Sequence, residues 1–283
     1  MAVTVTPRRR PAMTLGTPFT YLAALLVVGV TVIPLLFTII GGFRTNAQIN
    51  RAPAGWPHPW VFGNFTEVLS SSVFWRAMGN SAFIAVVATV LAVATGAMAA
   101  FALSRYRFAG REGLYTLFTI GLLFPLTAAA LPMYLLLRQL NLLEQPLGVA
   151  LPEAAFSLPI TIVILRPFMH AIPGELEDAA AMDGASRLGF FWRILLPLSR
   201  PALTTVAILA FVTSWNAYLL PMLVLSDRAD FTLPLGVAAF QTQYSQDTAK
   251  ILAYTAASMI PAIGFFVFAE RHIVGGLTGS VKG

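Results

Sequence analysis

Acidic residues gather in one short stretch of an otherwise basic chain. The 283-residue sequence holds 12 Asp and Glu against 18 Lys and Arg, and four of those acids lie within Glu175–Asp183. Proline is tolerated at the first helical position, and acids in the first turn favour the positive end of the helix dipole. Pro173, the acids and three alanines therefore predict a short helix. Its acidic face suits either a basic partner or solvent.

The residues that follow predict a second short helix. Gly184 is a permissive break, and Ser186 is a suitable N-cap for a helix over 187–196. Proline then redirects the chain at Pro197 and Pro201. We expect a helix-turn-helix whose second helix packs on membrane helices through Phe190, Phe191, Ile194 and Leu195.

Residues for catalysis or metal binding are scarce. The chain has no cysteine and three histidines, which are scattered at His58, His170 and His272 and belong to no His-Glu-x2-His motif. The two lysines, Lys250 and Lys282, follow no phosphate-binding loop. We expect no catalytic residue, no metal site and no cofactor in this chain. An intramembrane enzyme and a proton-coupled carrier are both disfavoured, the latter because Glu153 alone among the acids falls in an apolar stretch.

Some polar and aromatic residues fall within the apolar stretches and are candidates for a solute path. Asn216 and Tyr218 are suited to a cavity, but Asn216 is equally suited to bonding between helices, and Trp215 and Tyr218 to packing or to anchoring at the membrane interface. Glu153 is suited either to the outer membrane interface or to a solute. Four prolines can break helices at membrane depth, at 125, 132, 159 and 221. The full candidate set is Asn80, Tyr134, Glu153, Trp215, Asn216 and Tyr218.

The apolar composition of the chain predicts that these residues are positioned by membrane-spanning helices. The chain is 57% apolar and 11% charged, with a mean hydropathy of +0.76, so a water-soluble domain is excluded. Stretches without charge, or with Glu153 alone, are long enough to cross a bilayer as helices. The sequence predicts an all-α integral membrane protein with six transmembrane helices, over 19–43 and about 78–103, 113–137, 147–168, 201–224 and 251–270.

The basic residues predict the orientation of these helices. With both termini in the cytoplasm, 12 Lys and Arg lie inside and six outside, as the positive-inside rule requires. The surplus therefore reflects topology, and we expect no nucleic acid partner. Segments 1–18 and 272–283 are predicted to be cytoplasmic, as is the loop 170–200. Segment 44–75 is predicted to be an outer loop, folded or interfacial, with Trp56 and Trp60.

The loop motif resembles a known family. Asp178-Ala179-Ala180, three residues, Gly184, nine residues, Ile194, one residue and Leu196-Pro197 are similar to the EAA loop of ABC-importer permeases, with Asp in place of the usual Glu. Asn80-Ser81, the run Ala99–Arg111, Trp215-Asn216 and the tail His272–Gly283 resemble the six-helix subunit of sugar permeases of the maltose-transporter type.

The resemblance implies a fold, a mechanism and partners. The fold is that of type-I ABC importer permeases, with 76–271 as the transmembrane domain. The family's loop couples to a separate ATPase, which binds ATP and Mg. The partners are a homologous second permease, two ATPase subunits, an extracytoplasmic solute-binding protein and membrane lipid. The implied coupling residues are Glu177, Asp178, Ala179, Ala180, Asp183, Gly184, Ile194, Leu196 and Pro197.

The sequence is compatible with more than one class of transported solute. The Trp-Asn and tail patterns suggest a sugar or oligosaccharide, carried by a bacterial inner-membrane importer. The same kind of subunit also carries glycerophosphodiesters, polyols or amino acids. The motif itself does not separate these solutes.

Overall fold

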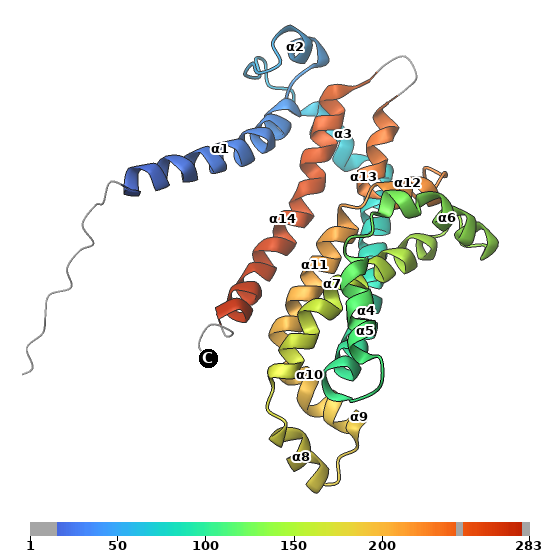
Figure 1. Ribbon diagram of the computed structural model, residues 1–283. Coiled ribbons are helices and arrows are strands. Elements are labelled where there is room, and N and C mark those ends of the chain that lie inside the picture. The colour runs from blue at the N-terminus through green and yellow to red at the C-terminus, as the bar shows by residue number, and fades with distance from the viewer. Residues whose placement is uncertain (1–15, 242–245, 279–283) are drawn as a thin grey trace, which may run out of the picture.

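The computed structural model describes residues 16–241 and 246–278, and throughout these ranges the regular structure is helical. The predicted N-terminal segment lies outside them up to residue 15, with Arg8, Arg9 and Arg10, as does Lys282 in the predicted tail. The five longest helices are α1 (Gly16–Gly41), α4 (Ser72–Arg105), α7 (Pro146–Ala171), α11 (Arg200–Trp215) and α14 (Thr248–Thr278). Of these, α4, α11 and α14 run along the length of the molecule (Figure 1).

Four of the helices in the described ranges, α1, α4, α7 and α14, are long and apolar enough to cross a membrane. Two further candidates are bent pairs. In the first, α5 (Arg111–Gly121) meets α6 (Leu126–Gln139) at 101°. In the second, the segment Arg187–Leu198 meets α11 at 78°. The chain is therefore a multi-pass membrane protein with four to six spans.

Two stretches predicted as single helices are broken in the structure. The stretch 113–137 is divided between α5 and α6, with Pro125 as the N-cap of α6. Proline lacks the backbone donor that would continue a helix and disfavours helical geometry in the residue before it, Phe124. The stretch 201–224 is likewise divided after Trp215, and the short helix α12 (Leu219–Val224) follows.

The centre of the bundle is α4, which packs on α7 and α11. Its buried face is rich in small residues, including Ala92, Gly96 and Ala100. Small side chains let helix backbones approach closely, and interfaces between membrane helices are enriched in them. At Gly96 the approach is so close that a Cβ atom would collide with the side chain of Thr161 on α7.

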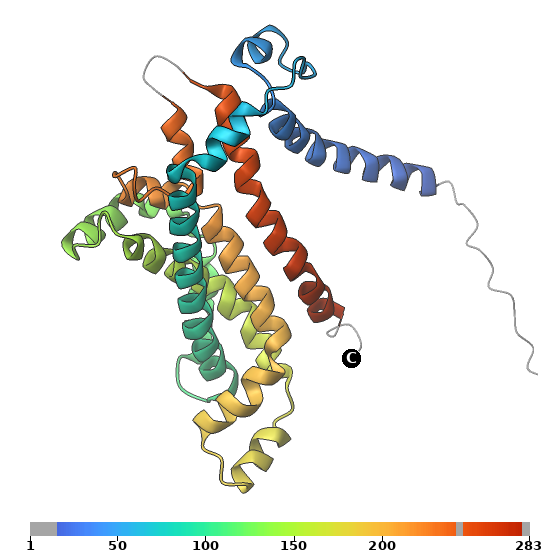
Figure 2. The ribbon, with the colours of Figure 1, turned by 180° about the vertical axis from the view of Figure 1, so that it is seen from behind.

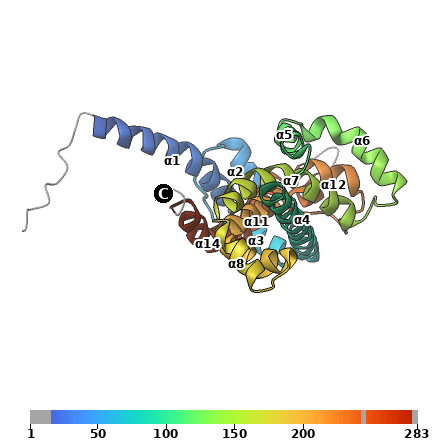
Figure 3. The ribbon, with the colours of Figure 1, turned by 60° about the horizontal axis from the view of Figure 1, so that its bottom comes forward.

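Helix α1 stands apart from this bundle. Its apolar window has no buried residue, and it extends away from the other helices in two views (Figures 1 and 3). It contacts α14 near its C-terminal end, where Gly41 lies against Leu252.

The segment after α1 is folded. It contains α2 (Asn46–Arg51) and α3 (Gly63–Ser70). Arg44, only 2% exposed, donates hydrogen bonds to the carbonyls of Pro53, Gln48 and Ala52 at 2.7, 2.6 and 2.5 Å. Asn64 donates to the carbonyls of Gly42 and Arg44. These bonds fix the chain where it leaves α1.

Candidate functional site

The loop between α7 and α11 forms a helix-turn-helix at the end of the molecule opposite α2 (Figures 1 and 2). It consists of α8 (Glu175–Met182), α9 (Arg187–Phe190), a π-helical turn (Phe191–Leu195) and α10 (Leu196–Leu198). Gly184 has a φ of +80°, a conformation that glycine adopts without strain. The hydroxyl of Ser186 accepts a hydrogen bond from the Gly189 amide at 3.1 Å, so Ser186 caps α9 as predicted.

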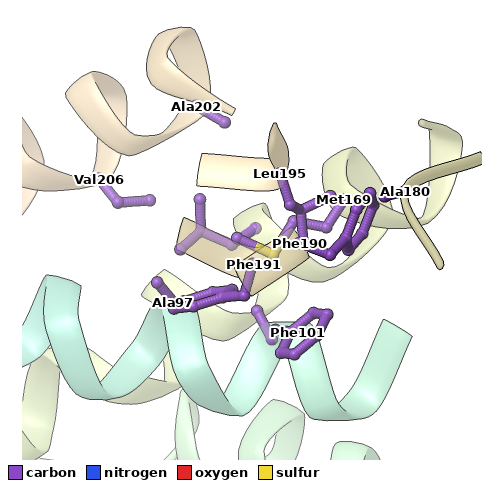
Figure 4. Close-up of a cluster of buried hydrophobic side chains, with 11 residues drawn as sticks. Ala97, Phe101, Met169, Ala180, Phe190, Phe191, Leu195, Ala202 and Val206 are labelled. Carbon is purple, nitrogen blue, oxygen red and sulfur yellow. The ribbon is translucent and has the colours of Figure 1, made fainter. Parts of the chain in front are cut away.

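The second half of the loop packs into the bundle (Figure 4). Phe190, Phe191 and Leu195 are buried in a cluster that holds Ala97 and Phe101 of α4 together with residues of α7 and α11. Ile194 and Leu196 are partly buried against the same cluster, whereas Pro197 is exposed. This half of the loop is thereby attached to three membrane helices at once.

The first half of the loop divides its residues between core and solvent. Ala180 is the one buried residue of α8 and joins the same cluster. Asp178, Ala179, Asp183 and Gly184 are exposed, as is Met182 at 89%. The exposed side of the motif therefore consists of a short helix, the carboxylates of Asp178 and Asp183, and the turn at Gly184, which has no side chain.

Glu177 differs from the other acids because it faces the bundle. Its carboxylate lies 3.9 Å from Arg105, the last residue of α4. Arg105 also donates hydrogen bonds to the carbonyls of Met169 and Ile172, at 2.8 and 2.7 Å. Carbonyls at a helix C-terminus have no partner within the helix and favour a nearby cation. Arg105 thus joins the ends of α4 and α7 and faces α8.

The role of Arg105 was missed at the level of sequence, where it counted only as a basic residue of an inner loop. The available signal was its position, directly after a span and within the run Ala99–Arg111. Arg166 on α7 also joins helices, in this case α7 to α4 and α5. It donates to the Leu103 carbonyl and to Glu112, and its guanidinium lies 3.9 Å from the ring centre of Tyr115 on α5.

A cavity of about 660 Å³ lies between α8 and the connection from α4 to α5. One wall is basic, with Arg105, Arg107 and Arg111, and the other carries Glu175 and Glu177. Charged side chains of both signs therefore border this cavity.

Three of the residues proposed for a solute path lie at or near the break after α11. Trp215 is 7% exposed and stacks on Phe211. Asn216 donates to the Val212 carbonyl at 2.8 Å, and Tyr218 is 51% exposed. Trp215 and Asn216 line a cavity of about 330 Å³ with Thr255, Ser258 and other residues of α14. The two α14 hydroxyls were not among the predicted residues, although both interrupt an apolar stretch.

The other three candidates do not line this cavity. Asn80 donates to the carbonyls of Ala229 and Phe231 at 3.0 and 3.2 Å, which ties α4 to the loop after α12. Tyr134 is partly buried on α6. Glu153, on α7, is 9% exposed and accepts a hydrogen bond from Ser214 on α11. The six candidates therefore do not form one site.

Within the described ranges, no group of three or more His, Asp and Glu side chains is placed to hold a metal ion. The site has no arrangement of nucleophile and base either. What the loop does present is a helix bearing acids and a glycine turn, attached to the ends of α4, α7 and α11.

The chain matches the family of binding-protein-dependent transport system inner membrane components over residues 92–272, and it belongs to that family. It is similar to the trehalose transport system permease protein SugB of Mycobacterium tuberculosis, at 35% identity over 93% of this chain and 98% of that protein. It is also similar to the arabinooligosaccharides transport system permease protein AraQ of Halalkalibacterium halodurans, at 34% identity over 90% and 92%. The predicted membership of the ABC permeases is confirmed.

The fold is shared with a solved structure. A chain in the crystal structure of a bacterial ABC transporter involved in the import of the acidic polysaccharide alginate superposes with a TM-score of 0.77. The alignment covers 93% of this chain and 99% of that one, at 21% identity. The likeness is one of fold alone.

Proposed function

We propose that this chain is a permease subunit of an ATP-driven importer for a sugar or oligosaccharide. The names of the relatives support the substrate class, since they include permease proteins for trehalose, arabinooligosaccharides and diacetylchitobiose. The subunit spans the inner membrane six times, with α5 and α6 forming one span and α11 with α12 another, and both termini lie in the cytoplasm. It supplies half of the solute path.

In this proposal, α8 and the Gly184 turn dock on a separate ATPase subunit. The observation that carries it is the division of the motif, with Ala180 and the second helix packed in the bundle and Asp178–Gly184 mostly free for a partner. The ATPase binds ATP and Mg, and its movement is transmitted through the loop to α4, α7 and α11. The complete importer contains a second, homologous permease, two ATPase subunits and an extracytoplasmic solute-binding protein.

The test is ATP hydrolysis and sugar uptake by the importer reconstituted in lipid, with and without sugar-loaded binding protein. We expect Gly184→Arg to lower both rates about tenfold or more, the effect of losing about 1.4 kcal/mol of docking free energy. A side chain at Gly184 would have open space around it, but the φ of this residue favours glycine. The bulk of the arginine side chain and the strain in the backbone could therefore each lower the rates. Gly184→Asn tests strain, because asparagine tolerates this conformation.

Gly174→Arg is the matched control, because Gly174 also offers open space, directly before α8, and has an ordinary φ of −67°. We expect it to retain most of the activity. Unchanged sugar-stimulated hydrolysis in Gly184→Arg, or ATP hydrolysis by this chain alone, would contradict the proposal.

A further inference from the structure

We propose that the second half of the loop, segment 187–198, lies on the cytoplasmic leaflet of the membrane and binds anionic lipid headgroups through its outer face. This contact is separate from the docking of α8 on an ATPase. The outer face consists of Leu188, Trp192 and Leu198 with Arg193, and Arg200 follows directly at the start of α11.

The segment has two unlike faces. Phe190, Phe191 and Leu195 are at most 2% exposed and face the bundle. On the other side, Leu188, Trp192 and Leu198 are 62%, 58% and 47% exposed. A helix with apolar side chains on both faces has one face covered by the protein and needs an apolar medium for the other.

The depth of the segment follows from its buried face. The ring of Phe191 lies 4.9 Å from that of Phe101 on α4, and the same cluster contains Ala97 of α4 and Leu165 of α7. Ala97 and Phe101 belong to the uncharged stretch that ends at Ser104, directly before Arg105. The segment therefore lies level with the last turns of the α4 span, where the hydrocarbon core meets the headgroups.

The direction of the segment fits the same place. It meets α11 at 78°, so with α11 crossing the membrane the segment runs close to the membrane plane. Helices that lie in this plane carry Trp and Leu toward the acyl chains and Arg toward the headgroups. Tryptophan is enriched at this depth because its ring is apolar and its N–H is polar.

The charges identify the kind of lipid. Arg193 and Arg200 are exposed, and no ion pair between described residues involves either of them. Arginines at the cytoplasmic surface are attracted to anionic headgroups. A phosphate headgroup supplies the partner that the protein itself does not, while the acyl chains cover Leu188 and Trp192.

The natural absence of cysteine permits a direct test with single-cysteine variants of the full chain, assembled with its ATPase and permease partners in lipid nanodiscs. Leu188→Cys carries a nitroxide spin label, and its collisions with oxygen and with a water-soluble nickel chelate are measured. Oxygen concentrates in lipid and the chelate in water. Met182→Cys, in the same loop but on α8, is the matched control.

We expect the label at 188 to collide more with oxygen than with nickel, and the label at 182 to show the reverse or to be shielded by the ATPase. High nickel collision at 188 would mean exposure to water, and low collision with both reagents would mean burial against a partner protein. Either result would overturn the proposal. Trp192→Cys repeats the measurement one turn further on.

The headgroup part is tested by comparing nanodiscs of phosphatidylcholine alone with nanodiscs that also contain phosphatidylglycerol. We expect the anionic lipid to shift the label at 188 deeper, and Arg193→Gln with Arg200→Gln to abolish the shift. An equal depth in both kinds of nanodisc would contradict anionic recognition. Sugar-stimulated ATP hydrolysis measured on the same samples tests the docking of α8 independently.

Discussion

At the scale of single residues, Arg105 carries the most connections in the loop region. Its side chain is 8% exposed and reaches the last carbonyls of α7, the carboxylate of Glu177 and, at 6.0 Å, the ring of Phe190. One guanidinium thus links α4, which carries it, to α7, α8 and α9. A buried cation with this many partners holds those elements in one arrangement, because any shift leaves charge or carbonyls unpaired.

We expect Arg105→Ala to lower sugar uptake more than ATP hydrolysis, because α8 can still dock but no longer moves with α4 and α7. Each charge-assisted hydrogen bond contributes about 1.5–3 kcal/mol, so the loss of two should also lower the thermal stability of the chain. Uptake per ATP hydrolysed in proteoliposomes measures the effect.

The control is Arg107→Ala, two residues away and exposed, whose side chain forms no ion pair with another described residue. Glu177→Gln should change uptake much less than Arg105→Ala, because an ion pair at 3.9 Å and partly exposed contributes about 1 kcal/mol or less. Equal ratios of uptake to hydrolysis in the wild type and in Arg105→Ala would show that Arg105 only stabilises the fold.

At the scale of elements, the contact between α4 and α7 decides how tightly the bundle packs. We expect Gly96→Ala to destabilise the chain by about 1–3 kcal/mol, since the added methyl group meets Thr161 and overpacking costs that much. Gly79→Ala is the control, on the same helix but with open space around its Cβ position. It should be neutral or stabilise α4 by up to about 1 kcal/mol. Thermal unfolding in detergent measures both variants.

Much of the helical arrangement could be predicted because charges mark where apolar stretches end. The two short helices of the loop were also predictable, because a proline, a glycine and an N-cap serine are local signals. The break at Pro125 was one of four that prolines allowed, but which proline bends the chain was not predictable, since Pro159 lies within the unbroken helix α7. Nor were the bonds of Arg105, because they join residues 64 and 67 positions apart, and no local pattern encodes such a contact.

The predicted solute path shows the same limit. A polar residue in an apolar stretch is consistent both with a role in function and with a contact between helices. Only the structure distinguishes these roles, because it shows which groups each side chain bonds or faces. Asn80 bonds to a loop and Glu153 to a neighbouring helix, whereas Trp215 and Asn216 face a cavity.

At the scale of the whole molecule, the excess of basic residues on one side predicts the orientation in the membrane. Ala54, in the segment after α2, and Met182, on α8, are both exposed, and the helices α2 and α8 lie at opposite ends of the molecule (Figure 1). In a chain without cysteine, we expect Ala54→Cys to react with a membrane-impermeant maleimide added to spheroplasts. Met182→Cys should react only in inside-out vesicles. The opposite pattern of labelling would show that the predicted orientation is wrong.

Helix α1 is little covered by the rest of its own chain. Its C-terminal end, the root, is fixed by the hydrogen bonds of Arg44 and by the close packing of Gly42 against Phe65 and Ala253. Its 26 residues make a rod of about 39 Å at 1.5 Å per residue. A tilt of about 5° at the root would move the far end by about 3 Å over that length. A small shift of segment 42–65, where α1 is attached, would therefore be magnified along the length of the helix.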